Sequence, residues 1–473
     1  MNAVERKSRS RIAREFRAIA VLFLFCVFCV VQPADAYSVL SHEEVVDMAW
    51  QSHIVPLLMA RFPKTDANGL IEAHAYAYGG CVIQDIGYYP FGSHLFSDLL
   101  HYVRTGDFVT ALLRDATDVN EYAFALGAMA HYASDVNGHP YINEVTPEEY
   151  PKLGTLFGRH VTYDDDPIAH LRTEFGFDVV EVARGRYAQD DYRRFIGFQV
   201  SKQLLERAFQ ETYGFNVKDI MPHEDLAINS YRRSISSLIP KMTHVALANY
   251  GKDIKAETPN FDRKKFLYRF DRTQFETQYG KEYLRPSRKA RFVAFLLNLV
   301  PKVGPLRDLQ LHMPNAKEQD LYLKSVNQAV DRYDDELDQM KSARADLHGP
   351  VLEDRDLDTG GASTSGEYRL ADLTYATLLE KLMSHPMVPI PKQLHDNLVA
   401  FYADPNPPKT LNPNAKGERH AKDWTSADWP KVEADVELLR SAVLLPPPPV
   451  EPVVLPPDIK LLPTPKEKPR KQS

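Results

Sequence analysis

The stretch NEYAFALGAMAHYASDVNGHPYIN, from Asn120 to Asn143, decides the fold of this chain. Its spacing predicts one apolar helix, and its alanine and glycine residues would let neighbouring helices approach closely. His131 and Asp135 are four residues apart, so they share one face of that helix. His139 lies four residues further on, beside Gly138, where we expect the helix to end. Three potential ligands on adjacent turns are typical of a helical bundle that holds metal in its core.

A second histidine–carboxylate pair has the same spacing. His170 and Glu174 are four residues apart on a helix predicted over residues 168–183, directly after a proline. A histidine and a carboxylate on one helical face can bind a divalent ion together. His160 and Asp164 form an alternative pair with the same spacing. We favour the pair of His170 and Glu174. In the alternative pair, Asp164 begins a run of three aspartates and a proline, which is typical of a loop.

The rest of the chain has mainly helical periodicity, and no series of segments alternates as strands do. We therefore predict an all-α fold, a multi-helix bundle. Further helices are expected over residues 42–58, 96–103, 108–113, 192–209, 223–250, 263–279, 289–299, 317–347 and 368–383.

Composition predicts how the chain is divided. Glycine, proline and charged residues interrupt the helices near 250–262, so we predict one domain at 37–250, which contains the histidine–carboxylate pairs, and a helical C-terminal region of unknown role at 260–445. Between the last two predicted helices, residues 359–366 are expected to form a flexible loop. The proline-rich end, residues 446–473, predicts a disordered tail.

The N-terminal segment predicts export. Six basic residues within the first 17 are followed by an apolar run from Ala18 to Val31 and by the small-x-small sequence Ala34-Asp35-Ala36. This combination is typical of a secretory signal peptide over residues 1–36, because the apolar run is short for a membrane span. An uncleaved anchor helix is the alternative. Cleavage after Ala36 would make Tyr37 the mature N-terminus of a secreted or periplasmic protein.

Cysteine content and charge narrow the function classes. Cys26 and Cys29 would leave with the signal peptide, so Cys81 would remain alone and no intrachain disulfide could form. Cys81 is expected to be a packed thiol rather than a nucleophile. The formal net charge of −7 gives no support for nucleic acid as a packaging partner.

The mature N-terminus would read Tyr37-Ser-Val-Leu-Ser-His42, and its free amine and carbonyl could chelate a metal together with His42. Here the sequence resembles the zinc-dependent phospholipase C family, which shares a fold with the S1/P1 nucleases. Those proteins begin with an aromatic residue, usually tryptophan, whose amine and carbonyl bind zinc, and a histidine follows. The resemblance covers roughly residues 37–250 and implies a bundle of the phospholipase C/P1 nuclease type.

The resemblance also implies a set of zinc ligands. In chain order they are Tyr37, His42, Asp85, His101, His131, Asp135, His139, His170 and Glu174. The implied first zinc ion would be bound by Asp85, His101 and His131, with Asp135 bridging from it.

Two further zinc ions complete the implied site. His139, His170 and Glu174 would hold the second ion. Tyr37 and His42 would hold the third, which would share the bridging aspartate with the first.

Two features differ from the family pattern, and one ligand position has an alternative residue. His139 follows the preceding aspartate by four residues, where the family more often has six, and the long segment before His170 implies an insertion. His94, seven residues before His101, is an alternative ligand. We favour His101 because its distance from Asp85 along the chain is nearer to that of the family.

This implied site predicts phosphate ester hydrolysis. Three zinc ions bring more positive charge than three carboxylates cancel, and the histidines bind as neutral ligands, so the site would attract anions. Zinc lowers the pKa of bound water to about 7, and ions about 3.5–4 Å apart can stabilise the attacking and leaving oxygens at phosphorus. We therefore expect attack by metal-bound hydroxide, with Asp85 orienting or deprotonating the water.

The favoured function is that of a phospholipase C acting on a phospholipid or another phosphate ester. An S1/P1-like nuclease or phosphatase is the first alternative, but the predicted catalytic region has no obvious basic stripe for nucleic acid. The fungal and plant nucleases of this fold also carry disulfides. A non-catalytic zinc-binding helical secreted protein is the second alternative, although open coordination positions favour catalysis.

Contact with a membrane is left open by the sequence. Residues 288–302 are basic at both ends and apolar between, which suits either peripheral contact with a membrane surface or a buried helix with charged ends. The buried helix is the favoured interpretation.

Overall fold

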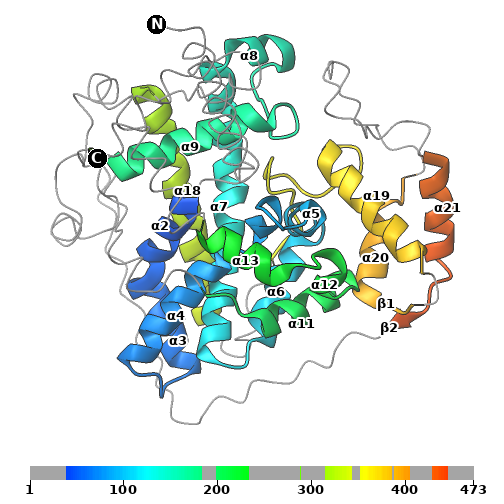
Figure 1. The fold of residues 1–473 in the computed structure, drawn as a ribbon, viewed down its shortest axis with the longest axis horizontal. Coiled ribbons are helices and arrows are strands. Elements are labelled where there is room, and N and C mark those ends of the chain that lie inside the picture. The colour runs from blue at the N-terminus through cyan, green and yellow to red at the C-terminus, as the bar shows by residue number, and fades with distance from the viewer. Residues whose placement is uncertain are drawn as a thin grey trace, which may run out of the picture.

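The computed structural model describes residues 39–183, 199–233, 288, 315–342, 352–385, 388–404 and 429–445. Its secondary structure is almost entirely helical (Figure 1), and the two strands in the described part have two residues each. β1 (Ile390–Pro391) and β2 (Leu444–Leu445) pair in parallel. The all-α class is therefore confirmed. The predicted signal peptide with Tyr37, the boundary near 250–262, the helices at 263–279 and 289–299, and the C-terminal tail lie outside the described residues.

Helix α7 (Val119–Glu149) runs through the middle of the structure. Asp118 caps its N-terminus, because the Asp118 side chain accepts hydrogen bonds from the backbone amides of Asn120 and Glu121. The prediction that this helix ends near Gly138 is wrong, because the helix continues through two prolines to residue 149. Ile142 and Val145 are buried beyond Gly138, so packing of this last part offsets the backbone hydrogen bonds that proline removes.

Helix α4 (Ala67–Gly80) crosses α7 at very short range. A Cβ atom placed on Gly127 would lie 1.9 Å from the carbonyl oxygen of Ala77, and one placed on Gly80 would lie 1.9 Å from that of Phe124. The two backbones are in direct contact, as the small residues of the opening stretch predicted. Glycine at both positions is what allows this crossing.

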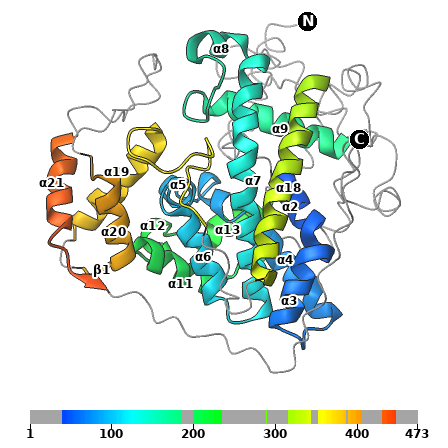
Figure 2. The same cartoon turned by 180° about the vertical axis from the view of Figure 1, so that it is seen from behind.

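Helix α18 (Ala316–Ser342) packs along α7 on another side (Figure 2). Tyr322, Val326 and Tyr333 are buried in this contact, and the Tyr333 hydroxyl donates to the carbonyl of Leu126 at 2.8 Å. Described residues on both sides of the predicted boundary at 250–262 therefore share one hydrophobic core.

The remaining elements surround these three helices. They are α2 (Val39–Ala49), the π-helix η1 (Trp50–Ile54), α3 (Val55–Arg61), the 3-10 helix η2 (Gln84–Tyr88), α5 (His94–Tyr102), α6 (Thr105–Asp115), α8 (Pro151–Phe157), α9 (Pro167–Ala183), α11 (Lys202–Tyr213), α12 (Val217–Ile220), α13 (Glu224–Arg233), α19 (Arg369–Met383), α20 (Lys392–Phe401) and α21 (Trp429–Leu439). The break between the helices predicted over 96–103 and 108–113 lies at Arg104, which has a φ of 51°.

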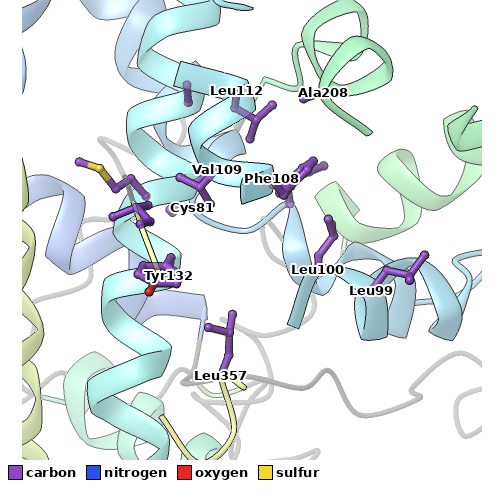
Figure 3. Close-up of a cluster of buried hydrophobic side chains, with 14 of the residues drawn as sticks. Cys81, Leu99, Leu100, Phe108, Val109, Leu112, Tyr132, Ala208 and Leu357 are labelled. Atoms are coloured by element: carbon purple, nitrogen blue, oxygen red, sulfur yellow. The ribbon is translucent and has the colours of Figure 1, made fainter. Parts of the chain in front are cut away.

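Residues 352–368, which precede α19, are non-helical, as predicted for residues 359–366, and they are packed against the core. Leu357 is fully buried in a cluster of hydrophobic side chains (Figure 3). The labelled members of this cluster are Cys81, Leu99, Leu100, Phe108, Val109, Leu112, Tyr132, Ala208 and Leu357. The backbone amide of Leu357 also donates to the carbonyl of His101 at 3.0 Å. This segment is thereby held beside α5, α6 and α7.

Within the described ranges, no helix is both long enough and apolar enough to span a bilayer.

Candidate metal centre

Eight of the nine predicted ligands are described, and all eight lie together in the interior. They come from α2, η2, α5, α7 and α9, which meet around the middle of α7 (Figure 1). Each is no more than 2% exposed: His42, Asp85, His101, His131, Asp135, His139, His170 and Glu174. The ninth predicted ligand, Tyr37, lies outside the described residues. Helices far apart in the sequence therefore deliver one buried cluster of imidazoles and carboxylates.

Asp135 lies at the centre of this cluster. Its Oδ2 is 2.9 Å from His131 Nε2 and 3.5 Å from His101 Nε2. Its Oδ1 is 3.4 Å from His42 Nε2 and 3.6 Å from His139 Nε2. One carboxylate thus faces four imidazoles, which is the geometry that a ligand shared between ions requires.

The first set of potential ligands comprises Asp85, His101 and His131, whose ligand atoms lie within 4.8 Å of one another. Asp85 Oδ1 is 3.4 Å from His101 Nε2 and 3.9 Å from His131 Nε2. A second set is formed by His42, His131 and Asp135. The rings of His42 and His131 stack at 4.2 Å between centroids, so the two sets are adjacent.

The third set comprises His139, His170 and Glu174, again within 4.8 Å. Glu174 Oε1 is 2.9 Å from His170 Nε2 and 3.7 Å from His139 Nε2. Because His139 also faces Asp135, this set is joined to the others through α7. The first and third sets have the same members as two groupings that the resemblance implied, whereas the set around His42 contains His131, which the resemblance placed on the first ion.

The alternative ligands lie away from this cluster. His94 is exposed on the first turn of α5, and its ring lies 5.5 Å from that of Tyr88. His160 is exposed, and Asp164 forms a buried ion pair with Arg369. The geometry therefore favours His101 over His94, and the His170 pair over the His160 pair.

Hydrogen bonds at Nδ1 orient the imidazoles of His101 and His131. Nδ1 of His101 lies 2.8 Å from the carbonyl oxygen of Ser97, and Nδ1 of His131 lies 2.9 Å from that of Cys81. A neutral imidazole that donates from Nδ1 keeps the lone pair of Nε2 for a metal. In both residues Nε2 is the nitrogen that faces the carboxylates. Cys81 itself is a buried thiol whose pKa is raised by burial, as expected of a packed residue.

His139 is oriented by Asp358, a residue that the sequence did not indicate as part of the site. Nδ1 of His139 donates to Oδ1 of Asp358 at 3.1 Å, and Asp358 lies in the segment between α18 and α19. The two residues are 219 positions apart, so no periodic pattern links them. The alternating aspartates in the sequence DRDLD, at 354–358, were the one signal available in that segment.

These residues fit a divalent metal. Several buried polar atoms at this centre make no hydrogen bond of good geometry within the described part of the chain: Nε2 of His101 and His131, both carboxylate oxygens of Asp85 and of Asp135, both ring nitrogens of His170, and Oε1 of Glu174. Buried polar atoms are normally satisfied, so this concentration needs an explanation. Imidazole nitrogens and carboxylate oxygens are ligands that zinc accepts, and a bound cation would satisfy them together.

The electrostatics agree with this fit. Burial opposes ionisation of Asp135, but the surrounding imidazoles, His131 foremost, hold its pKa well below its usual value. Burial also opposes protonation of the histidines, yet Asp135 and Asp85 raise the pKa of His101 well above its usual value. The pKa of His139 is raised to about 10. The carboxylates of this centre therefore attract compensating positive charge, which divalent cations would supply more effectively than protons.

Comparison with known proteins identifies the domain that carries this centre. A sequence model of the family described as zinc dependent phospholipase C matches residues 41–214, which contain all eight described ligands. No curated protein and no solved structure matched the chain significantly. The family is one of phosphodiesterase hydrolases, and its cofactor, zinc, suits the grouped histidines and carboxylates. Residues 41–214 of this chain therefore form a domain similar to the zinc-dependent phospholipase C family.

Proposed function

We propose that this chain is an exported phospholipase C that hydrolyses the phosphate ester between the glycerol and the headgroup of a phospholipid. The observation that carries the proposal is the position of Asp135, whose two oxygens face four imidazoles in a fully buried cluster. A structural zinc site is usually closed by four protein ligands around one ion. Three joined sets of ligands instead support several neighbouring ions with open positions.

Zinc, when bound, would supply positive charge beside the phosphorus and a water with a pKa of about 7, so that hydroxide is the nucleophile we propose. The chain's own residues hold the reacting groups in place. His101 and His131 donate from Nδ1 to backbone carbonyls, so their Nε2 atoms remain neutral ligands and leave the positive charge of the site uncancelled. Such a site would bind the anionic phosphate diester of a phospholipid.

Asp85 is the residue we propose for proton transfer. Its Oδ1 faces His101 and His131, and its Oδ2 makes no hydrogen bond in the described part of the chain. Burial raises the pKa of this carboxyl in the metal-free protein. A carboxylate oxygen at this position can accept a hydrogen bond from a water at the centre. Asp85 could therefore orient the attacking water and accept its proton while it remains at the metal centre.

Export and membrane contact are part of the same proposal. The basic and apolar character of residues 1–36 supports a cleaved signal peptide and a secreted or periplasmic location. A phospholipid substrate lies in a bilayer or micelle, so the enzyme would contact that surface peripherally.

The test is a substrate panel with the purified mature protein, residues 37–473, loaded with zinc. Phosphatidylcholine, other phospholipids, single-stranded nucleic acid and a chromogenic phosphodiester would be compared, and products identified by mass spectrometry. The expected products from phospholipid are diacylglycerol and the phosphorylated headgroup. Hydrolysis of nucleic acid alone would replace this proposal with the nuclease function.

The alternative histidines provide matched controls for this assay. His101→Asn and His170→Asn should each lose bound zinc and phospholipid hydrolysis. His94→Asn and His160→Asn change the same residue type close by in the sequence but outside the cluster, so they should retain zinc. Equal zinc loss in both pairs would show that the geometric grouping does not identify the ligands.

A further inference from the structure

A buried carboxylate outside the family match reaches the metal centre. Asp358 is 2% exposed and lies in the segment between α18 and α19. Its Oδ1 accepts a hydrogen bond from His139 Nδ1 at 3.1 Å. Its Oδ2 accepts from the hydroxyls of Tyr102 at 2.8 Å and Tyr368 at 2.5 Å. Both carboxylate oxygens are therefore held by donors, and one of those donors is a candidate zinc ligand.

We propose that Asp358 is a positioning residue that holds His139 in the orientation and tautomer needed to bind zinc. The segment at residues 352–368 would thereby complete the metal centre. With Nδ1 donating to Asp358, the lone pair of Nε2 points toward Asp135 and Glu174, at 3.6 Å and 3.7 Å. An outer carboxylate also makes the imidazole a stronger ligand than a carbonyl partner does. His101 and His131 have carbonyl partners at the same position.

The segment is built to place this carboxylate. The Leu357 amide donates to the carbonyl of His101 at 3.0 Å, and the Leu357 side chain is buried in the hydrophobic cluster of Figure 3. Asn143 of α7 donates from its side chain to the carbonyl of Asp358 at 2.8 Å. Backbone contacts on both sides of Asp358 thus fix the segment to two helices that carry predicted ligands.

Gly360 allows the chain to pass close to α7 directly after Asp358. Its φ is +71°, a conformation that other residues adopt at a cost. A Cβ atom there would lie 2.5 Å from the carbonyl oxygen of Val136, which follows the shared aspartate Asp135 in α7. The turn therefore passes α7 between Asp135 and His139.

The neighbouring aspartates do not form a cation site with Asp358. Asp354 accepts from the backbone amides of Gly106 and Asp107, at 3.1 Å each, which anchors the segment to the first turn of α6. Asp356 accepts from the backbone amide of Asp358 at 2.9 Å. The three carboxylates point to different partners, so Asp358 acts through His139.

The test measures metal binding without substrate, on the full mature chain. Zinc affinity would be determined by competition with a chromophoric chelator, and the cobalt-loaded protein would be examined by visible absorption. Asp358→Asn should weaken one bound zinc ion by roughly 10–100-fold, the usual effect of losing an outer partner of a ligand. The cobalt spectrum should change as well, because His139 would no longer be held in place.

Asp354→Asn is the matched control, since it weakens the anchoring of the same segment and contacts no ligand histidine. It should lower the Tm while leaving zinc affinity and the cobalt spectrum unchanged. Asp358→Asn with wild-type zinc affinity and spectrum would overturn the proposal. An equal loss of zinc affinity in both variants would also overturn it, because the segment would then have only a structural role.

A second variant covers the case in which Asp358→Asn does not fold. The double substitution Tyr102→Phe with Tyr368→Phe removes both hydroxyls from Oδ2 and leaves the carboxylate in place. It should weaken zinc by less than about tenfold and shift the cobalt spectrum in the same direction; unchanged values would contradict the proposal. The inference rests on His139 being a ligand of the proposed centre, but it requires no particular substrate, so failure of the lipid assay leaves this test intact.

Discussion

His131 and Asp135 face each other across one turn of α7, with Nε2 of the histidine 2.9 Å from Oδ2 of the aspartate. The same aspartate also faces three further imidazoles, so the three ligand sets meet at this carboxylate. Sharing of a ligand between neighbouring metal ions therefore depends on Asp135.

Asp135→Asn should lower bound zinc and phosphodiester hydrolysis together. The neutral amide keeps the size of the side chain but loses the charge and one acceptor oxygen, so two ions lose a ligand. We expect more than the roughly 100-fold loss in affinity that removal of an outer partner causes. Zinc content by elemental analysis and turnover of a chromogenic phosphodiester would be measured on the same samples. Full activity with full zinc would contradict shared ligation.

Metal removal should destabilise the folded protein. Without cations, the carboxylates of Asp85, Asp135 and Glu174 stay buried with only imidazoles to compensate them. Zinc at about 100 times its Kd adds roughly 2.7 kcal/mol to stability, which corresponds to a Tm shift of about 5–10 °C in a domain of this size. Thermal unfolding with and without chelator would measure it, and added zinc should restore the Tm.

The matched control for metal removal is the same chelator titration on Asp135→Asn. Its Tm should respond less, because less metal is bound at the start. An identical chelator response in the two proteins would place the stabilising metal elsewhere.

The sequence predicted the part of the site that is local in the chain. His131, Asp135 and His139 are spaced by four residues, and helical geometry alone puts such residues on one face. The end of α7 was mispredicted because Gly138 and Pro140 favour termination locally, whereas tertiary packing beyond them sustains the helix.

The sequence did not predict contacts between residues that lie far apart in the chain. Asp358 meets His139 across 219 positions, and nothing in the local pattern around either residue specifies the other. Grouping Asp85 with His101 required the resemblance to a family, because their spacing fits no single helix or strand. Helix periodicity thus predicts which residues share a face, while the choice of facing partners depends on how the helices pack.

Gly127→Ala should destabilise the protein by about 3 kcal/mol or more. The new methyl group would lie 1.9 Å from the carbonyl oxygen of Ala77, so α4 and α7 would have to separate. Chemical denaturation would give the free energy of unfolding. Gly154→Ala in α8 is the control, because its nearest contact, Pro147 Cβ, is 3.1 Å away; its effect should stay within about 1 kcal/mol. Equal effects would mean that the crossing tolerates a side chain.

The proposed ligation of zinc by a free amino terminus at Tyr37 can be tested by a one-residue extension. We expect an alanine added before Tyr37 to reduce bound zinc by about one ion per chain, because the terminal amine and carbonyl would no longer reach the position that His42 shares. Native mass spectrometry would count the ions. Tyr37→Trp should retain all the zinc, since the proposed ligands are backbone atoms. An extended protein with undiminished zinc would exclude the amino terminus as a ligand.

Glu149→Gln should stabilise the protein, and increasingly so as the pH rises. Glu149 is buried at the end of α7, where it accepts a hydrogen bond from the Thr173 hydroxyl at 2.9 Å. Burial, together with Glu318, raises the pKa of this carboxyl from 4.5 to about 8. The folded state therefore keeps a proton that the unfolded chain loses above pH 4.5. The folded protein therefore loses stability as the pH rises from 4.5 toward 8. Glutamine mimics the protonated form of glutamate and avoids this loss.

The gain in the free energy of unfolding should be near zero at pH 4.5 and grow by up to about 1.4 kcal/mol per pH unit until about pH 8. Denaturant unfolding at three pH values would measure it, with Glu148→Gln at the neighbouring position as a control for the change in net charge. A gain that is constant with pH would show that Glu149 ionises equally in the folded and unfolded states. Because Glu149 also bonds Thr173, the residue before Glu174, a stabilised Gln variant with unchanged zinc would further show that this buried acid is separable from the metal centre.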